Sequence, residues 1–196
     1  MMEDILKIAA QNQKRAWEII EETDIINIWE SIGAHINLIG SVKTGLLMKN
    51  RDIDFHIYSY PLKISESFKA MTRLAENPSI KRLEYSNLTD TEEECIEWHV
   101  WYHDNNNIIW KMDMIHILQG SLFDGHMEKV SDRILERLTP DTKKIILKLK
   151  YDTPENEKIM GIEYYKAVLE DGIKTYEGLI EWRNNNPAEK LLHWIP

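Results

Sequence analysis

The apolar segment DIDFHIY, residues 52–58, carries two carboxylates where a buried strand would carry none. Side chains alternate along a strand, so Asp52 and Asp54 share one face, roughly 7 Å apart along the chain. Like charges this close repel each other, and burial of either without a partner is costly. The segment therefore predicts a strand whose two acids face a positively charged group.

The residues before this strand carry a second pattern. The apolar run at residues 34–39 ends in Gly40 and Ser41, and a mixed spacer of ten residues, 42–51, leads to Asp52. A glycine lets the backbone approach a phosphate, while a serine hydroxyl and free amides at a helix start can hold triphosphate oxygens. The pattern is typical of a nucleotide site.

The carboxylate pair suits Mg²⁺, which takes oxygen ligands and usually accepts only one or two carboxylates, with water and phosphate supplying the rest. Two such ions can clamp the attacking and leaving oxygens of a phosphoryl transfer. A third acid is then expected on a neighbouring strand. Asp113, a lone carboxylate in the apolar segment 107–118, is the candidate, and alternation places Lys111 on its face.

Periodicity along the rest of the chain predicts an α/β (α+β) protein: a mixed sheet with helices packed on it. The length of 196 residues fits one domain. Within it, the pattern changes from mixed helices and strands in a core at residues 1–125 to helices alone in a C-terminal segment at 126–196. Strands are expected at 34–40, 52–58, 79–86, 94–103 and 107–118, and helices at 3–22, 23–33, 61–78, 126–138, 139–150, 161–172 and 173–183.

Charge and cysteine content limit the partners. The formal net charge is −9 and no lysine- or arginine-rich run is present, so long DNA or RNA is not expected as a partner, because non-specific affinity for it comes mainly from neutralising phosphates. A neutral or cationic small molecule or a protein fits better. A single cysteine, Cys95, suits a reducing compartment, and the N-terminal sequence lacks a signal peptide or membrane anchor, so a cytoplasmic location is expected.

The stretch from residue 37 to residue 57 resembles the signature of the DNA polymerase beta-like nucleotidyltransferases. That signature is an apolar run ending in Gly-Ser, a spacer of about ten residues, the motif Asp-x-Asp, and a later aspartate on another strand. In size and helical tail the chain is similar to the small antibiotic-modifying and toxin-associated members. The resemblance is weaker over 108–118, and elsewhere only the order of elements matches. It implies a Mg²⁺-dependent transfer of a nucleoside monophosphate from a nucleoside triphosphate to a hydroxyl.

The resemblance also implies roles for individual residues. Gly40 and Ser41 would hold the triphosphate, and Asp52 and Asp54 would bind the metal ions. Asp113 would complete the metal site and take the proton of the acceptor hydroxyl.

Lys43 falls in the spacer where the family often has a basic residue, which implies a phosphate contact. The family's usual arginine is absent there.

The acceptor stays open at this point. The acidic chain favours a small molecule, such as an antibiotic-like compound, as the acceptor of the transferred nucleotide. The alternatives are nucleotidylation of a partner protein, as in toxin-neutralising relatives, and a nucleotide-binding module without turnover.

A zinc site was weighed at Cys95, His99 and His103, whose spacing of four would stack them on one face of a helix. The interleaved aromatic and branched residues favour a strand, where four residues span about 13 Å, too far for one ion. His56 shares the face of the two acids, either as a partner to them or as a structural histidine.

Overall fold

The computed structural model describes residues 2–187, 191 and 194–196. No helix in these residues combines the length and apolar character needed to cross a bilayer. The helices are α1 (Met2–Thr23), α2 (Ile25–Glu30), α3 (Gly40–Thr44), α4 (Ile64–Ala75), α5 (His126–Arg137), α6 (Pro140–Asp152), α7 (Gly161–Leu169) and α8 (Tyr176–Asn185). The strands are β1 (His35–Ile39), β2 (Asp52–Ser59), β3 (Ile80–Leu88), β4 (Cys95–His103) and β5 (Ile109–Leu118).

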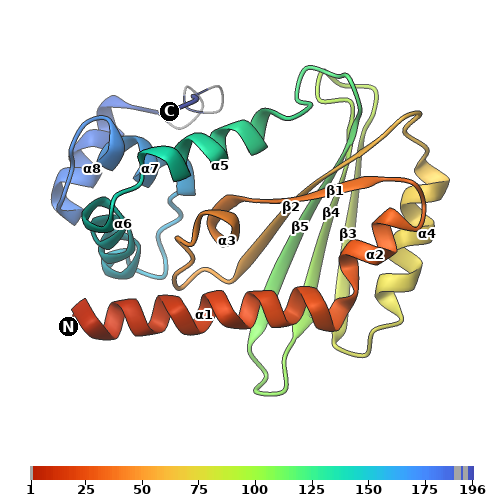
Figure 1. Ribbon diagram of the computed structural model, residues 1–196, viewed down its shortest axis with the longest axis horizontal. Coiled ribbons are helices and arrows are strands. Elements are labelled where there is room, and N and C mark those ends of the chain that lie inside the picture. Colours follow the sequence, from red (N-terminus) through yellow and green to blue (C-terminus); the bar gives the residue numbers. More distant parts are fainter. Residues whose placement is uncertain (1, 188–190, 192–193) are drawn as a thin grey trace.

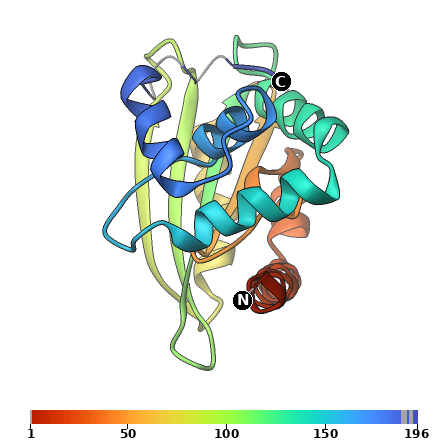
Figure 2. The same cartoon turned by 90° about the vertical axis from the view of Figure 1, so that its left-hand side faces the viewer.

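The strands form one five-stranded sheet in the order β1-β2-β5-β4-β3. β2 and β5 run parallel, whereas the pairs β1–β2, β4–β5 and β3–β4 are antiparallel. This confirms the predicted mixed sheet. In Figure 1, α2 and α4 lie on one side of the sheet and the C-terminal helices on the other, and Figure 2 shows the C-terminal helices in front of the strands.

Two apolar clusters hold the layers together. The first lies between the sheet and the helices α1, α2 and α4, and takes the inward residues of β2, Ile53, Phe55 and Ile57. The second joins α5–α8 with Ile5 and Ala9 at the start of α1. The C-terminal helices therefore share their core with the first residues of the chain, so α1 contributes to both clusters.

Local sequence signals explain the start of α6 but not that of α2. The sequence predicts Thr139 as the cap of α6 with Pro140 at the first helical position, and both are confirmed, because Thr139 accepts a hydrogen bond from the Thr142 amide. For α2 the sequence predicts Thr23 or Asp24 as the cap, and this prediction is wrong. Thr23 Oγ1 donates back to the Ile19 carbonyl, and Asp24 adopts a left-handed backbone, φ 54°, without a side-chain cap.

Candidate active site

Strand register brings the three predicted acids to one face of the sheet. Asp54 on β2 is the direct partner of Asp113 on the parallel strand β5. Asp113 is in turn the partner of His99 on β4, and Asp52 is the partner of Lys111. Asp52, Asp54 and Asp113 are called the carboxylate trio below.

The carboxylate trio lines a cavity of about 790 Å³ between the sheet and the C-terminal helices. Gly40 and Ser41 line the same cavity, so both halves of the sequence motif meet there. The wall opposite the sheet comes from α5, α6, α7 and the loop between α6 and α7. Its residues include Met127, Val130, Ser131, Ile134, Lys150, Thr153, Glu155, Glu157, Ile159, Tyr164 and Tyr165.

Gly40 packs directly against Asp54. Its φ of +66° lies in the left-handed region, and a Cβ atom added to it would stand 2.3 Å from Oδ2 of Asp54. Real Cβ atoms do not come that close to another heavy atom. Only glycine therefore fits, for reasons of backbone conformation and of space.

The electrostatics of the acid pair are those of a cation site. Burial raises the pKa of Asp54 to about 7, with further contributions from the negative charges of Asp52 and Asp113. Burial and the charge of Asp113 also raise the pKa of Asp52. Two buried carboxylates that destabilise each other's charged forms would be relieved by a hard cation, whose preferred ligands are oxygens. The residues present therefore fit Mg²⁺.

Asp113 is already engaged by two other side chains. Lys111 Nζ lies 2.8 Å from Oδ1 and 3.0 Å from Oδ2, and His99 Nδ1 lies 2.5 Å from Oδ1. Within the part of the chain that the structure describes, no three His, Cys, Asp or Glu side chains form a group able to hold an ion. Within the trio, Asp52 and Asp54 are therefore the carboxylates that form no hydrogen bond or ion pair with another described side chain.

Two candidates from the sequence lie elsewhere. Lys43 Nζ is 3.3 Å from Asp132 Oδ1 on α5, and Lys43 is not among the residues that line the cavity. Its phosphate contact stays a prediction. His56 follows Asp54 on the same face, but it hydrogen-bonds Tyr58 and lies 3.8 Å from Glu128, away from the cavity lining. Burial lowers the pKa of His56 to about 4, which suits a structural histidine.

Lys150 on α6 is a cavity residue that sequence reasoning missed. Its ammonium group donates to the carbonyl of Leu46, 2.9 Å away, and to the hydroxyl of Tyr165, 3.0 Å away. It also lies 4.9 Å from the centroid of the Tyr165 ring. Nothing in the helical pattern of residues 139–150 distinguishes this lysine from the others, because the sequence does not give the distance between α6 and the sheet.

Comparisons with known proteins give structural matches only. No protein-family model matches the chain, and no curated protein is a significant sequence match. Among solved structures, the Cid1 poly(U) polymerase with MgGTP bound superimposes with a TM-score of 0.59 at 13% identity, over 86% of this chain and 54% of that one.

Two further structures agree. The non-canonical poly(A) polymerase complex GLD-2–GLD-3 matches with a TM-score of 0.56 at 9% identity, over 95% of this chain and 59% of that one. A cytoplasmic RNA terminal U-transferase matches with a TM-score of 0.53 at 14% identity, over 85% of this chain and 51% of that one. The chain thus has the nucleotidyltransferase fold and spans about half the length of these proteins.

Proposed function

We propose that the protein is a Mg²⁺-dependent nucleotidyltransferase that moves a nucleoside monophosphate from a nucleoside triphosphate to an acceptor hydroxyl and releases pyrophosphate. The observation that carries the proposal is the carboxylate trio beside Gly40 in one cavity. The nucleotidyltransferase fold is a second support, because the structural match extends over 86% of the chain and not over the motif alone.

The carboxylates have separate roles in this proposal. Asp52 and Asp54 hold the metal, one ion or two, and Asp113 completes the site and accepts the proton of the acceptor hydroxyl. When bound, Mg²⁺ neutralises the charge that develops on the transferred phosphate. The enzyme's remaining task is to hold the two reactants in line.

The triphosphate is assigned to the end of the cavity near Gly40 and Ser41. Three cationic side chains line the cavity with them, Lys49, Arg51 and Lys150, and would offset the charge of the phosphates. Lys49 is tied to the C-terminal helices through the carbonyl of Thr153, 2.6 Å from its Nζ. A bound triphosphate would therefore bridge the sheet and the C-terminal helices.

For the acceptor we propose a small neutral or cationic molecule. The matched structures are described as RNA uridylyl- and adenylyltransferases, yet an RNA strand needs unpaired cations along its path. On the sheet face next to Asp113, Lys111 is paired with Asp113 and Arg82 with Glu84. Together with the net charge of −9, this pairing disfavours a polyanion.

The metal assignment is tested by nucleotide-induced stabilisation. Mg-ATP at a hundredfold excess over its dissociation constant should stabilise the protein by about 2.7 kcal/mol. Asp54→Asn should fold, because it removes a buried charge without changing shape, but should lose this stabilisation. Asp132→Asn, which alters an exposed acid outside the cavity, serves as control and should respond like the wild type. A full response from Asp54→Asn contradicts the assignment.

Turnover and acceptor class are tested by mass spectrometry. Each nucleoside triphosphate is incubated with the protein and Mg²⁺ in three separate reactions. The acceptors offered are aminated sugars in the first, a short RNA oligonucleotide in the second and a protein extract in the third. The proposal expects a small molecule whose mass has risen by that of one nucleoside monophosphate less one water. Extended RNA or a nucleotidylated protein would overturn the acceptor class only, whereas nucleotide binding without a product from any acceptor would favour a binding module.

A further inference from the structure

We propose that Lys111 is the internal counter-ion of the carboxylate trio, and that its ammonium group must leave Asp113 before a divalent cation can gain that carboxylate. The inference rests on the proposed function, since it concerns the same metal site. The inference adds Lys111 as a residue that lowers the affinity of the site for a cation. Asp113 can then bind the cation only after Lys111 has moved away.

The position of Lys111 follows from strand register. Lys111 is two residues before Asp113 on β5, so both side chains point to the same face of the sheet. On the neighbouring strand β2, the residue paired with Lys111 is Asp52. Its Nζ lies 2.8 Å and 3.0 Å from the two carboxylate oxygens of Asp113. The ammonium group therefore contacts one member of the trio, Asp113, while the backbone of Lys111 stands opposite another, Asp52.

The positive charge of Lys111 acts on the whole trio. Besides its direct contact with Asp113, it favours the charged forms of Asp52 and Asp54, which burial disfavours. This is the electrostatic effect expected of a metal ion at the same place. The side chain of Lys111 is 32% exposed, and its ammonium group also lies 5.9 Å from the centroid of the Trp101 ring.

Both oxygens of Asp113 are occupied in this arrangement. Lys111 contacts each of them, and His99 Nδ1 contacts Oδ1 as well. A divalent cation that takes Asp113 as a ligand would stand within a few ångströms of the ammonium group. The repulsion between the two positive charges then drives the lysine away, which costs part of the binding free energy of the cation. The displaced lysine remains beside the cavity, because its backbone position opposite Asp52 is fixed by the sheet.

The test compares Mn²⁺ binding to the wild type, Lys111→Met and Lys69→Met, measured by the electron paramagnetic resonance signal of free Mn²⁺. Methionine keeps the length of the lysine and removes its charge. We expect Lys111→Met to bind Mn²⁺ at least about tenfold more tightly, because a unit charge is removed a few ångströms from the ligands. Lys69→Met, whose lysine is exposed on α4 and pairs with Glu66 outside the cavity, should bind like the wild type.

Two further variants separate charge from shape. Lys111→Arg keeps the charge and should bind Mn²⁺ no more tightly than the wild type, while Lys111→Gln removes it and should reproduce the gain even if the methionine variant is poorly folded. Equal or weaker binding by the neutral variants overturns the inference; if the wild type still binds Mn²⁺ and Mg-ATP, the proposed function stands. Absence of Mn²⁺ binding to every variant overturns both.

Discussion

At the scale of single residues, the site depends on residue 40 being glycine, which has no side chain. A residue with a Cβ atom there would push into the carboxylate of Asp54, one of the two proposed metal ligands. The glycine of the first motif is therefore needed for the aspartate of the second to keep its place. The contact gives a structural reason for the two motifs to occur together in one chain.

Gly40→Ala should lose the stabilisation by Mg-ATP and should lower the free energy of unfolding by more than about 2 kcal/mol, from left-handed strain and the clash with Asp54. Gly33→Ala is the matched control, because Gly33 has φ +79° but no atom within 4 Å of the added Cβ. The control should cost only about 1 kcal/mol from strain and should keep the nucleotide response. Urea unfolding and thermal shift measure both; equal losses in the two variants would refute the contact.

His116 makes stability depend on pH. It is fully buried, hydrogen-bonds the hydroxyl of Ser59 through Nε2, and burial lowers its pKa to about 4 from an ordinary 6.5. Between these two pH values the unfolded chain binds a proton at this histidine that the folded chain does not, so the contribution of His116 to stability falls as pH falls. The loss is at most about 1.4 kcal/mol per pH unit for this histidine.

His116→Gln should therefore reduce the decline in unfolding free energy between pH 6.5 and pH 4.5, measured in urea at several pH values. The lowered pKa of His56, about 4, acts in the same direction and the raised pKa of Asp54, about 7, in the opposite direction, so the test is the difference between the variant and the wild type. The exposed His35 provides the control, and His35→Gln should leave the decline unchanged. An undiminished decline in His116→Gln would contradict the attribution.

The sequence predicts the contacts of some of these residues but not of others. Alternation alone places Asp52 and Asp54 together, since they lie on one strand. It cannot show that Asp113 contacts His99, because that contact depends on the register between β4 and β5. For the same reason His99 was considered only as a zinc ligand.

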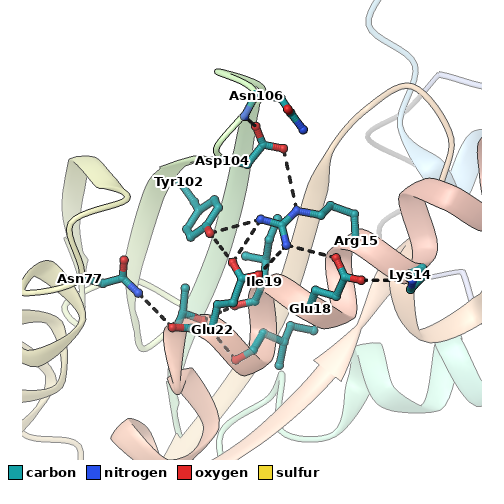
Figure 3. A network of polar contacts seen from close by, with 11 residues as sticks. Lys14, Arg15, Glu18, Ile19, Glu22, Asn77, Tyr102, Asp104 and Asn106 are labelled. Atoms are coloured by element: carbon teal, nitrogen blue, oxygen red, sulfur yellow. Dashed lines mark hydrogen bonds and ion pairs between the residues drawn. The ribbon is translucent and has the colours of Figure 1, made fainter.

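At the scale of elements, α1 is fixed to the sheet by a polar network (Figure 3). The guanidinium group of Arg15 hydrogen-bonds Glu22 and Tyr102 and lies 3.8 Å from Asp104, whose side chain is only 3% exposed. Asp104 in turn accepts hydrogen bonds from two amides of the turn between β4 and β5, so the network joins the helix to this hairpin.

Arg15→Met should destabilise the protein by about 2 kcal/mol, because it leaves the buried carboxylate of Asp104 without its cation. Lys14→Met is the adjacent control: Lys14 is 81% exposed and contacts only Glu18 among the residues of this network, so its loss should cost less than about 0.5 kcal/mol. Chemical denaturation compares them. Similar values for the two variants would show that the network adds little.

Elements were predicted better than their contacts. Each predicted strand is present within a few residues, because alternating and continuous apolar runs record burial directly. The capping error at α2 arose because Thr23 still belongs to α1 and bonds backward. Neither periodicity nor capping indicates that Lys150 of α6 faces the cavity.

At the scale of the whole molecule, the cavity lies between two apolar clusters that share α1. A fragment of residues 1–125 would expose Ile5, Leu46 and Met48, all buried in the second cluster. We therefore expect the full chain to unfold in a single calorimetric transition and the fragment to fail to fold stably. Two separate transitions, or a stable fragment, would show that the predicted division at residue 125 marks independent domains.

The most direct test of the central claim is a crystal structure with Mn²⁺ and a non-hydrolysable triphosphate, α,β-methylene-ATP, in which anomalous scattering locates the metal. The account predicts an anomalous peak between the carboxylates of Asp52 and Asp54, with the triphosphate against Gly40 and Ser41. A nucleotide bound elsewhere, or a metal that does not touch these two carboxylates, would contradict it.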